Sequence, residues 1–312
     1  MRLECRGLTK MNAGTLIKSS IITTPLIPFY EGNYSTRIYL KPENLQVLGS
    51  YKIRGIAQVI EDADPETLPW GLSCASAGNM AQALAYAAKI LKIPCKIFIP
   101  DTAPLLKKER ICALGAQLIE LPYQEIWQMV HENTRTHNNG LFIHPAYNSS
   151  LLKGYATIAE EIIDEMPDLD AIVIPFGVGG LSIGVGSAIR KLKADIAIYT
   201  CEPETAAPLK QSLLAKKPSK VNRIPSFVDA IGTPEVLPGV YDVIKEIIRD
   251  SLVIDLKKIH YMMNKLLTGN KLLCEGAAAC SAAAAVQLAQ QTDYKKIVCI
   301  LSGGNVPLEL VI

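Results

Sequence analysis

The run AIVIPFGVGGLSIG, residues 171–184, combines an apolar segment of strand length, a glycine loop and the start of a helical pattern. Its first six residues, Ala171–Phe176, contain no polar side chain. A strand that is apolar along its whole length is expected in a parallel sheet whose two faces are both covered by helices. Residues 171–189 carry no charge and are about as long as a membrane span, but Pro175 and the glycines favour strand, loop and helix. This stretch therefore predicts an α/β fold.

The alternation of strand and helix continues along the chain. Apolar runs of strand length occur at Arg37–Leu40, Cys95–Pro100, Gln117–Leu121, Leu141–His144, Ala171–Phe176, Ile196–Cys201 and Ile297–Leu301. Helical patterns lie between them, at Asn79–Leu91, Glu125–His137, Tyr155–Met166, Leu181–Lys193, Leu256–Leu267 and Glu275–Gln290. This order predicts mostly parallel sheets flanked by helices. We expect Lys210–Ser226, rich in lysine, proline and serine, to be a long surface loop.

Length and composition restrict the kind of protein. A chain of 312 residues is typical of about two domains. Lysine and arginine (32) nearly balance aspartate and glutamate (30), so a nucleic-acid or membrane-surface partner is not expected. The eight cysteines form no CxxC pair, which argues against a zinc site and fits a reducing compartment. Because residues 1–14 also lack the apolar core of a signal peptide, we expect a cytoplasmic protein.

Two polar segments stand at the start of predicted helices. Lys52, within GSYKIRG (49–55), has an apolar neighbour on each side, and burial can turn a lysine into an amine nucleophile. A solvated surface lysine is the simpler interpretation of that segment alone. SAGNMAQ (76–82) opens an alanine-rich helix, whose free N–H groups could bind an anion such as a carboxylate. A plain helix cap by Ser76 or Asn79 is the alternative.

The glycine loop after Phe176 predicts a phosphate site, because glycines let the backbone approach an anion at a helix N-terminus. A dinucleotide fingerprint fails here, since Ser182 stands at its third glycine. Glu202 nevertheless lies near the position expected of a ribose-binding acid. A P-loop fails because no lysine follows the glycines.

A serine hydrolase is a further interpretation of the same loop. Residues 180–184 match the G-x-S-x-G elbow of α/β-hydrolases. Asp229 or Asp255, followed by His260, would supply the usual chain order of the other two catalytic groups. Against this, Ser182 lies several residues beyond the end of the predicted strand, and His260 lies in a helical pattern.

Ser302 follows the last predicted strand, within LSGGN (301–305). A hydroxyl at the carboxyl end of a strand can bind a ligand in the crevice there, although a β-turn is the alternative. Taken together, the four segments resemble the fold-type II pyridoxal-phosphate (PLP) enzymes, and within them the threonine/serine dehydratase and serine racemase group. The resemblance covers nearly the whole chain, from TPL (24–26) and KPEN (41–44) to residues 302–305.

The resemblance implies a role for each segment around a PLP cofactor. Lys52 would be the Schiff-base lysine and would move the α-proton of the substrate. Asn79 would bind the ring hydroxyl of the cofactor, and Ser302 its pyridine nitrogen. The substrate carboxylate would be bound by Ser76, Ala77, Gly78, Asn79 and Met80. The cofactor phosphate would be bound by Gly177, Val178, Gly179, Gly180 and Leu181.

Several residues depart from the pattern of that group. Ala77 stands where serine racemases have a second serine, and because a methyl group cannot move a proton, racemisation by two acid/base groups is disfavoured. Val178 interrupts a run of glycines and would be strained if its position required a positive φ. In metal-dependent relatives, a glutamate at the position of Glu202 binds the metal together with an aspartate a few residues later. Pro208 stands in place of that aspartate here, so no metal site is predicted. The other departures are Met80 for histidine, Tyr147-Asn148 for an acidic pair, Tyr155 for glutamine and Ala230 for glycine.

The implied architecture is that of the tryptophan synthase β-like fold. Residues 65–147 would form a small domain inserted into a large one made of residues 1–64 plus 148–312, with the site between them. The chain ends seven residues after Asn305, so the regulatory domain of biosynthetic threonine dehydratases is not expected. A homo-oligomer, dimer or tetramer, is expected from the same resemblance.

The implied reaction is α,β-elimination of a small β-hydroxy amino acid, such as L-threonine or L-serine, to a 2-oxo acid and ammonia. A neutral serine at the ring nitrogen suits elimination better than transamination, because it leaves the ring a weaker electron sink. A PLP-dependent β-replacement enzyme is the nearest alternative. The departures around the pocket leave a non-catalytic relative that binds PLP or an amino acid as a third.

Overall fold

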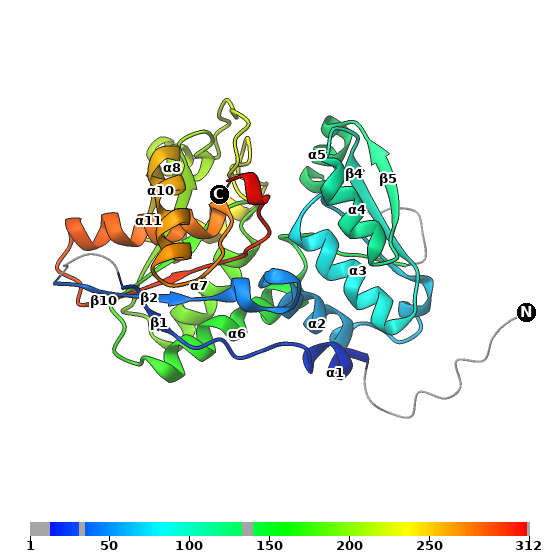
Figure 1. Ribbon diagram of the computed structural model, residues 1–312, viewed down its shortest axis with the longest axis horizontal. Coiled ribbons are helices and arrows are strands. Elements are labelled where there is room, and N and C mark those ends of the chain that lie inside the picture. Colours follow the sequence, from blue (N-terminus) through cyan, green and yellow to red (C-terminus); the bar gives the residue numbers. More distant parts are fainter. Residues whose placement is uncertain (1–12, 31–34, 133–139, 311–312) are drawn as a thin grey trace, which may run out of the picture.

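The computed structural model describes residues 13–30, 35–132 and 140–310. Within them the chain forms a six-stranded and a four-stranded sheet, each flanked by helices (Figure 1). The larger sheet lies in the left-hand lobe of Figure 1 and the smaller sheet in the right-hand lobe. The predicted α/β class with mostly parallel sheets is therefore confirmed.

The six-stranded sheet has the strand order β1-β2-β10-β7-β8-β9. β1 is antiparallel to β2, and every other neighbouring pair is parallel. The bounds of its strands are Ile27–Pro28 (β1), Arg37–Lys41 (β2), Ala171–Pro175 (β7), Ala197–Pro203 (β8), Asp250–Ile254 (β9) and Lys296–Ile300 (β10).

The four-stranded sheet has the order β5-β4-β3-β6 and is parallel throughout. Its strands are Leu72–Ala75 (β3), Cys95–Pro100 (β4), Gln117–Leu121 (β5) and Leu141–Phe142 (β6). The helices that connect them are Asn79–Leu91 (α3), Leu105–Ala113 (α4) and Tyr123–His131 (α5). The predicted division at residues 65 and 147 into two domains stays a prediction.

The central strands of the larger sheet are apolar because both of their faces are covered. In β7, Ile172 and Ile174 belong to one apolar core, while Ala171 and Val173 belong to a second core on the other face. The first core includes residues of α2 (Lys52–Asp62), α6 (Ser149–Glu165) and α7 (Gly180–Leu192). The second includes residues of α10 (Leu256–Thr268) and α11 (Gly276–Gln291). Alternate side chains of one apolar strand thus pack against different helices.

The parallel register brings two of the predicted motifs to one edge. Val173 of β7 lies opposite Cys299 of β10, so the two strands end side by side. The glycine loop follows β7, and Ser302 follows β10. Ligands of open α/β sheets bind outside the carboxyl ends of strands such as these.

Some predicted elements differ from the structure. Lys210–Ser226 is not a loop throughout, because α8 covers Pro208–Ala215. Pro208 stands at the first helical position, and the Glu202 carboxylate accepts the N–H groups of Leu209 and Lys210 at 2.8 Å, which together start this helix. The predicted strand over 141–144 covers 141–142 alone, and residues 133–137 of one predicted helix lie outside the described residues. Elements without a prediction are α1 (Ala13–Lys18), α4, α8, α9 (Val240–Ile247), β1 and β9.

Candidate active site

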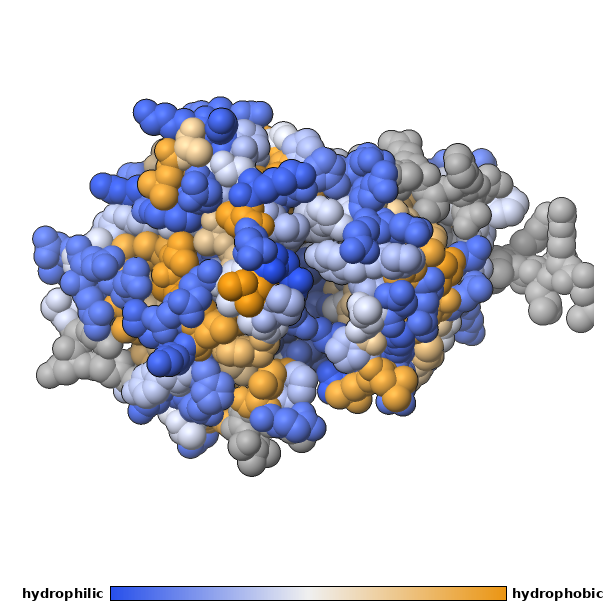
Figure 2. Space-filling model, turned by 90° about the horizontal axis from the view of Figure 1, so that it is seen from above, coloured by the Kyte–Doolittle hydropathy of each residue, from blue (hydrophilic) through white to orange (hydrophobic). Residues whose placement is uncertain are grey.

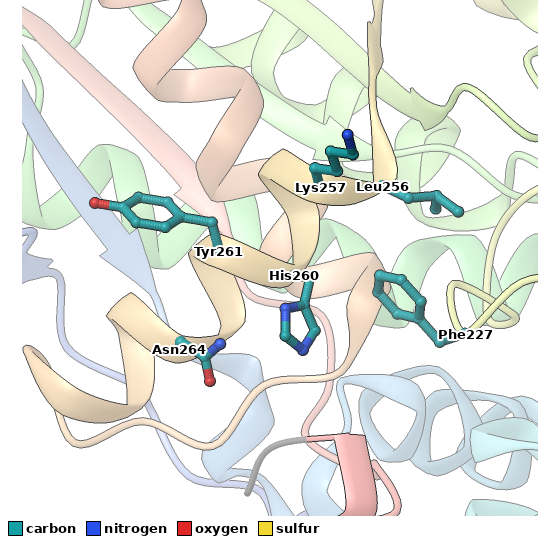
Figure 3. Close-up of a pocket in the computed structure, with 6 residues that line it drawn as sticks. All are labelled: Phe227, Leu256, Lys257, His260, Tyr261 and Asn264. Atoms are coloured by element: carbon teal, nitrogen blue, oxygen red, sulfur yellow. The ribbon is translucent and has the colours of Figure 1, made fainter.

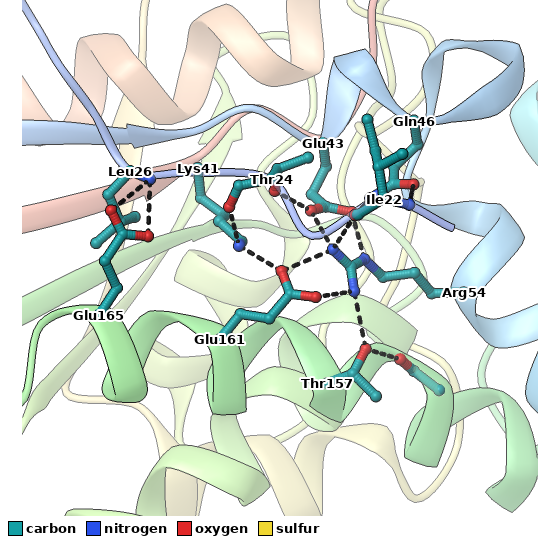
Figure 4. A network of polar contacts seen from close by, with 11 residues as sticks. Ile22, Thr24, Leu26, Lys41, Glu43, Gln46, Arg54, Thr157, Glu161 and Glu165 are labelled. Carbon is teal, nitrogen blue, oxygen red and sulfur yellow. Dashed lines mark hydrogen bonds and ion pairs between the residues drawn. The ribbon is translucent and has the colours of Figure 1, made fainter. Parts of the chain in front are cut away.

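A buried network of charges fixes the helix that begins at Lys52 (Figure 4). Arg54 donates to Glu43 at 2.7 Å and to Glu161 of α6 at 2.6 Å. Lys41 of β2 donates to the same Glu161 at 2.5 Å and to the carbonyl of Thr24 at 2.5 Å. Each charge is paired, as burial requires, so the network joins β2, α2 and α6 rigidly.

The ionisation of this network follows from its geometry. Burial by itself would raise the pKa of Glu161, but its hydrogen bonds to Arg54 and Lys41 and their charges lower it overall. Burial would lower the pKa of Arg54, but Glu43 and Glu161 raise it overall. Both groups therefore stay charged at neutral pH.

Lys52 is the first residue of α2, and its side chain is half-buried. Its Nζ lies 4.6 Å from the ring centroid of Tyr51 and 5.7 Å from that of Tyr155. Among the described residues, no carboxylate or other acceptor pairs with this amine, in contrast to Lys41 in the neighbouring network. The amine is thus left available for a ligand.

The glycine loop presents a row of backbone donors. Among the described residues, the N–H groups of Gly177 to Leu181 have no acceptor, and they lie where α7 begins. Gly179 has a φ of 98°, whereas Val178 has a negative φ and is therefore not strained. The valine at this position keeps its N–H available to an anion.

The second loop follows β3 and opens α3. The hydroxyl of Ser76 accepts the N–H of Gly78 at 3.2 Å. The N–H groups of Ala77, Asn79 and Met80 have no acceptor in the described part of the chain, as expected at a helix start. The Met80 side chain is buried, whereas Ser76 to Asn79 are half-exposed. This loop is a second row of donors, suited to a carboxylate.

Two residues without a predicted role hold the Asn79 side chain. Its amide nitrogen donates to both carboxylate oxygens of Glu275, at 2.9 and 3.1 Å, and its amide oxygen accepts from Asn305 at 2.9 Å. Burial raises the pKa of Glu275 to about 7, although Asn79 and the charge of Lys52 act in the opposite direction. In the sequence, Glu275 is the one charged residue of the otherwise apolar run 272–280, and this position could have indicated that its side chain is buried.

Ser302 lies against the start of α2. Its carbonyl accepts the N–H of Tyr51 at 3.2 Å, and Gly303 forms a β-bridge with Ser50. The Ser302 side chain is 4% exposed, and its hydroxyl has no partner among the described residues. These contacts hold Ser302 and Lys52 in the same part of the structure.

The residues of the alternative serine-hydrolase and dinucleotide-binding interpretations have other roles in the structure. The Ser182 hydroxyl is buried and donates to the carbonyl of Pro175 at 3.1 Å, so it is a structural group and not an exposed nucleophile. The carboxylate of Glu202 is buried and used at the start of α8 and by the hydroxyl of Ser251, which gives it a structural role. Burial raises the pKa of Glu202 to about 7. His260 lines a separate open pocket of about 420 Å³, with Phe227 and residues of α10 (Figure 3).

The surface is hollowed between the two lobes (Figure 2), and polar contacts cross between them. Lys107 of α4 forms an ion pair with Asp229. Trp127 of α5 donates from its ring N–H to Glu235 at 3.3 Å, and the Tyr147 hydroxyl donates to the carbonyl of Pro238 at 2.6 Å. The segment 229–238 therefore connects the lobes at three places, Asp229, Glu235 and Pro238.

Comparison with known proteins identifies the family. Residues 17–303 match the family described as pyridoxal-phosphate dependent enzyme. The chain is 31% identical to a biosynthetic L-threonine dehydratase of Halalkalibacterium halodurans, over 94% of this chain and 72% of that protein. It is 33% identical to serine racemase of Rattus norvegicus, over 94% of this chain and 90% of the racemase. The chain belongs to the pyridoxal-phosphate dependent enzymes.

The fold agrees with this membership. The structure of processed threonine deaminase isoform 2 from Solanum lycopersicum superimposes with a TM-score of 0.84 at 25% identity, covering 94% of this chain and 87% of that one. Pyridoxal phosphate is the cofactor of this family and of this chain. The predicted family, its fold and its cofactor are thus confirmed.

The residues present fit pyridoxal phosphate. The unpaired N–H groups at 177–181 suit its phosphate, the unpaired amine of Lys52 suits its aldehyde, and the partnerless hydroxyl of Ser302 suits a ring atom. In the described part of the chain, no three His, Cys, Asp or Glu side chains are grouped to hold a metal ion. No helix there has the length and apolar character needed to cross a membrane.

Proposed function

We propose that this chain catalyses PLP-dependent α,β-elimination of a small β-hydroxy amino acid, such as L-threonine or L-serine, to a 2-oxo acid and ammonia. The observation that carries the proposal is the unpaired Nζ of Lys52, held at the start of α2 beside the Ser302 loop. Relatives named threonine dehydratase support elimination, and relatives named serine racemase mean that the reaction needs a direct test.

Each row of donors would have one task. The N–H groups of residues 177–181 would bind the cofactor phosphate, and the Ser302 hydroxyl the ring nitrogen. The loop 76–80 would bind the substrate carboxylate through its free N–H groups. Asn79, which Glu275 and Asn305 orient, would form a hydrogen bond with the cofactor's ring hydroxyl. These groups would fix the substrate for proton removal.

Lys52 would hold the cofactor covalently and, once the substrate's amino group has displaced it, would take the α-proton on Nζ. Pyridoxal phosphate, when bound, supplies the electron sink that makes this proton acidic. The buried Arg54 network would keep the first turn of α2 in place while the Lys52 side chain moves. The β-hydroxyl would then take up a proton and leave as water, and hydrolysis of the released enamine by another water would give the 2-oxo acid and ammonia.

We infer from residue 77 that elimination is favoured over racemisation. By the resemblance, Ala77 stands where a racemase has a second acid/base group, and a methyl group cannot deliver a proton. The Ala77 side chain is half-exposed at the start of α3. Lys52 would then be the one group that moves a proton at the substrate's α-carbon. Protonation of that carbon on the face away from Lys52, which would give the D-amino acid, would be slow.

Product analysis tests the reaction. Purified protein with PLP is incubated with L-threonine, with L-serine and with a panel of other amino acids, and the 2-oxo acid, ammonia and D-amino acid are quantified. Equal amounts of 2-oxo acid and ammonia from L-threonine or L-serine support the proposal. A new product that appears when a thiol or an amine is added would instead indicate β-replacement. PLP binding without any product from the panel would indicate the non-catalytic alternative.

We also propose that residues 65–147 move as a small domain against residues 1–64 plus 148–312, closing over the substrate. The Lys107–Asp229 pair would be a contact of the closed form. Small-angle scattering with and without substrate, on wild type and Lys107→Ala, tests this; identical profiles throughout would contradict it.

A cytoplasmic homo-oligomer, dimer or tetramer, completes the proposal. The seven cysteines in the described part of the chain are all free, and six of them are buried, which suits a reducing compartment. Light scattering of the purified protein measures the oligomeric state, and a monomer at micromolar concentration would contradict it.

A further inference from the structure

Tyr155 lies in the middle of α6, and its side chain is fully buried against glycines of α7. A Cβ added at Gly184 would lie 3.0 Å from the Cβ of Tyr155, whereas one added at Gly180 would lie 3.6 Å from Cε2 of its ring. Because Gly180 is the first residue of α7, the side chain runs along this helix toward its start. The hydroxyl, at the far end of the ring, therefore points toward the N-terminus of α7.

The same ring is held against α2. A Cβ added at Gly55 would lie 2.5 Å from Cε1 and 2.9 Å from Cζ, the atom that carries the hydroxyl. Gly55 belongs to the first turn of α2, and the ring of Tyr51, just before that helix, meets the Tyr155 ring edge to face with centroids 4.8 Å apart. Packing thus fixes the hydroxyl between the first turns of two helices, where backbone N–H groups favour an anion.

The Tyr155 hydroxyl is buried and has no hydrogen-bond partner among the described residues. The Lys52 Nζ lies 5.7 Å from the ring centroid but forms no hydrogen bond with the hydroxyl. Burial, with smaller contributions from Tyr51 and Cys74, raises the pKa of the hydroxyl well above its usual value, so it stays protonated and can donate. Folded proteins pair nearly all of their buried polar groups, and an unpaired one requires an explanation.

The group that suits this hydroxyl is an anion at the start of α7. The N–H groups of residues 177–181 have no acceptor in the described part of the chain, so they suit the same anion. We propose that the Tyr155 hydroxyl donates to the phosphate of the cofactor, beside these N–H groups. The inference rests on the proposed function, which assigns the phosphate to this loop. The group that the chain resembles has glutamine at this position, so the contact would be particular to this chain.

The size of the effect follows from the charge of the acceptor. A hydrogen bond from a neutral hydroxyl to a phosphate oxygen is charge-assisted and stronger than one between neutral groups. Because packing already fixes the ring, forming this bond orders no further side chain. Tyr155→Phe should therefore weaken PLP binding by roughly 10-fold or more. Without PLP, the same variant should melt at the wild-type temperature or higher, because it removes an unpaired buried hydroxyl.

The test compares PLP with pyridoxal, which has the same ring and aldehyde but no phosphate. Fluorescence titration of the apo-protein measures the affinities of wild type and Tyr155→Phe for both ligands. The contributions of Lys52, Asn79 and Ser302 are common to the two ligands and cancel in the ratio of the affinities. We expect the wild type to prefer PLP, and this preference to fall roughly 10-fold or more in Tyr155→Phe through loss of PLP affinity alone.

Tyr199→Phe is the matched control. Tyr199 is also largely buried, but it lies on β8 in the second core, and its hydroxyl is paired with that of Tyr294 at 3.2 Å. This variant should keep the wild-type affinities for both ligands. A wild type that prefers PLP, with the same preference in Tyr155→Phe, would overturn this inference alone. A wild type that binds pyridoxal as tightly as PLP would overturn the assignment of the phosphate to residues 177–181 together with it.

Discussion

The amide nitrogen of Asn305 donates to the amide oxygen of Asn79 at 2.9 Å, joining two motifs that are 226 positions apart in the chain. The same nitrogen donates to the carbonyl of Leu48 at 2.7 Å, just before the helix of Lys52. One side chain thus connects the loop after β10, the start of α3 and the approach to α2. The orientation of Asn79 depends on this connection.

Asn305→Ala should weaken PLP binding about 10-fold, since the loss of one or two such hydrogen bonds costs roughly 1–2 kcal/mol. Fluorescence titration of the apo-protein with PLP measures this. Asn264→Ala, at a half-buried asparagine in the separate pocket of Figure 3, is the control and should bind as the wild type does. Equal affinities in the two variants would show that Asn79 does not need Asn305.

Glu275 makes the apo-protein less stable as pH rises. Burial raises its pKa from 4.5 to about 7, so between these values the folded state binds more protons than the unfolded state. The free energy of unfolding therefore falls with pH over this window, by about 3 kcal/mol at most. Glu275→Gln removes the effect, and its melting temperature relative to the wild type should rise from pH 4.5 to pH 7. A constant difference would contradict this.

Glu161 acts in the opposite direction. Arg54 and Lys41 lower the pKa of Glu161 in the folded state below its value in the unfolded state. The contribution of Glu161 to the free energy of unfolding is therefore complete above the pKa of the unfolded state, and it is lost as the pH falls through the pKa of the folded state. Glu161→Gln should cost about 3 kcal/mol at pH 7, because it leaves buried charges unpaired. The loss should shrink on acidification. Urea unfolding at several pH values measures it, with the exposed neighbour Glu160→Gln as a control that stays close to wild type.

Ala77→Ser tests the assignment of the second face of the substrate. A hydroxyl there should raise formation of D-serine from L-serine by roughly 10- to 100-fold, because it supplies the missing proton-moving group. Chiral chromatography of the products measures this. Ala77→Gly controls for a change of shape without a hydroxyl. If both variants form as little D-serine as the wild type, the position does not control racemisation.

The parts of the site that follow local rules could be predicted from the sequence. The glycine loop and Ser302 each follow an apolar strand, and Lys52 and Asn79 each stand at the start of a helix. The positions of these residues at strand ends and helix starts could therefore be predicted from the residues next to them in the chain. Glu275 and Asn305 could not be assigned roles, because their contacts with Asn79 join residues about 200 positions apart. Tyr155 was visible as a departure, but its unpaired hydroxyl depends on packing among α2, α6 and α7.

The same limit explains the missed elements. Helix α8 begins because the carboxylate of Glu202, at the end of β8, accepts two of its first N–H groups. The segment itself, with its lysines and Pro218, resembles a loop. β9 is a short strand at the edge of the sheet, and its pairing with β8 decides its structure more than its own pattern does.

The most direct test of the account is the visible absorbance spectrum of the purified protein with added PLP, for the wild type, Lys52→Ala and the exposed-lysine control Lys89→Ala. We predict a band of lysine-bound cofactor in the wild type and in Lys89→Ala, and its loss in Lys52→Ala. A band that persists in Lys52→Ala would show that another amine holds the cofactor. No band in the wild type with PLP in excess would contradict the account as a whole.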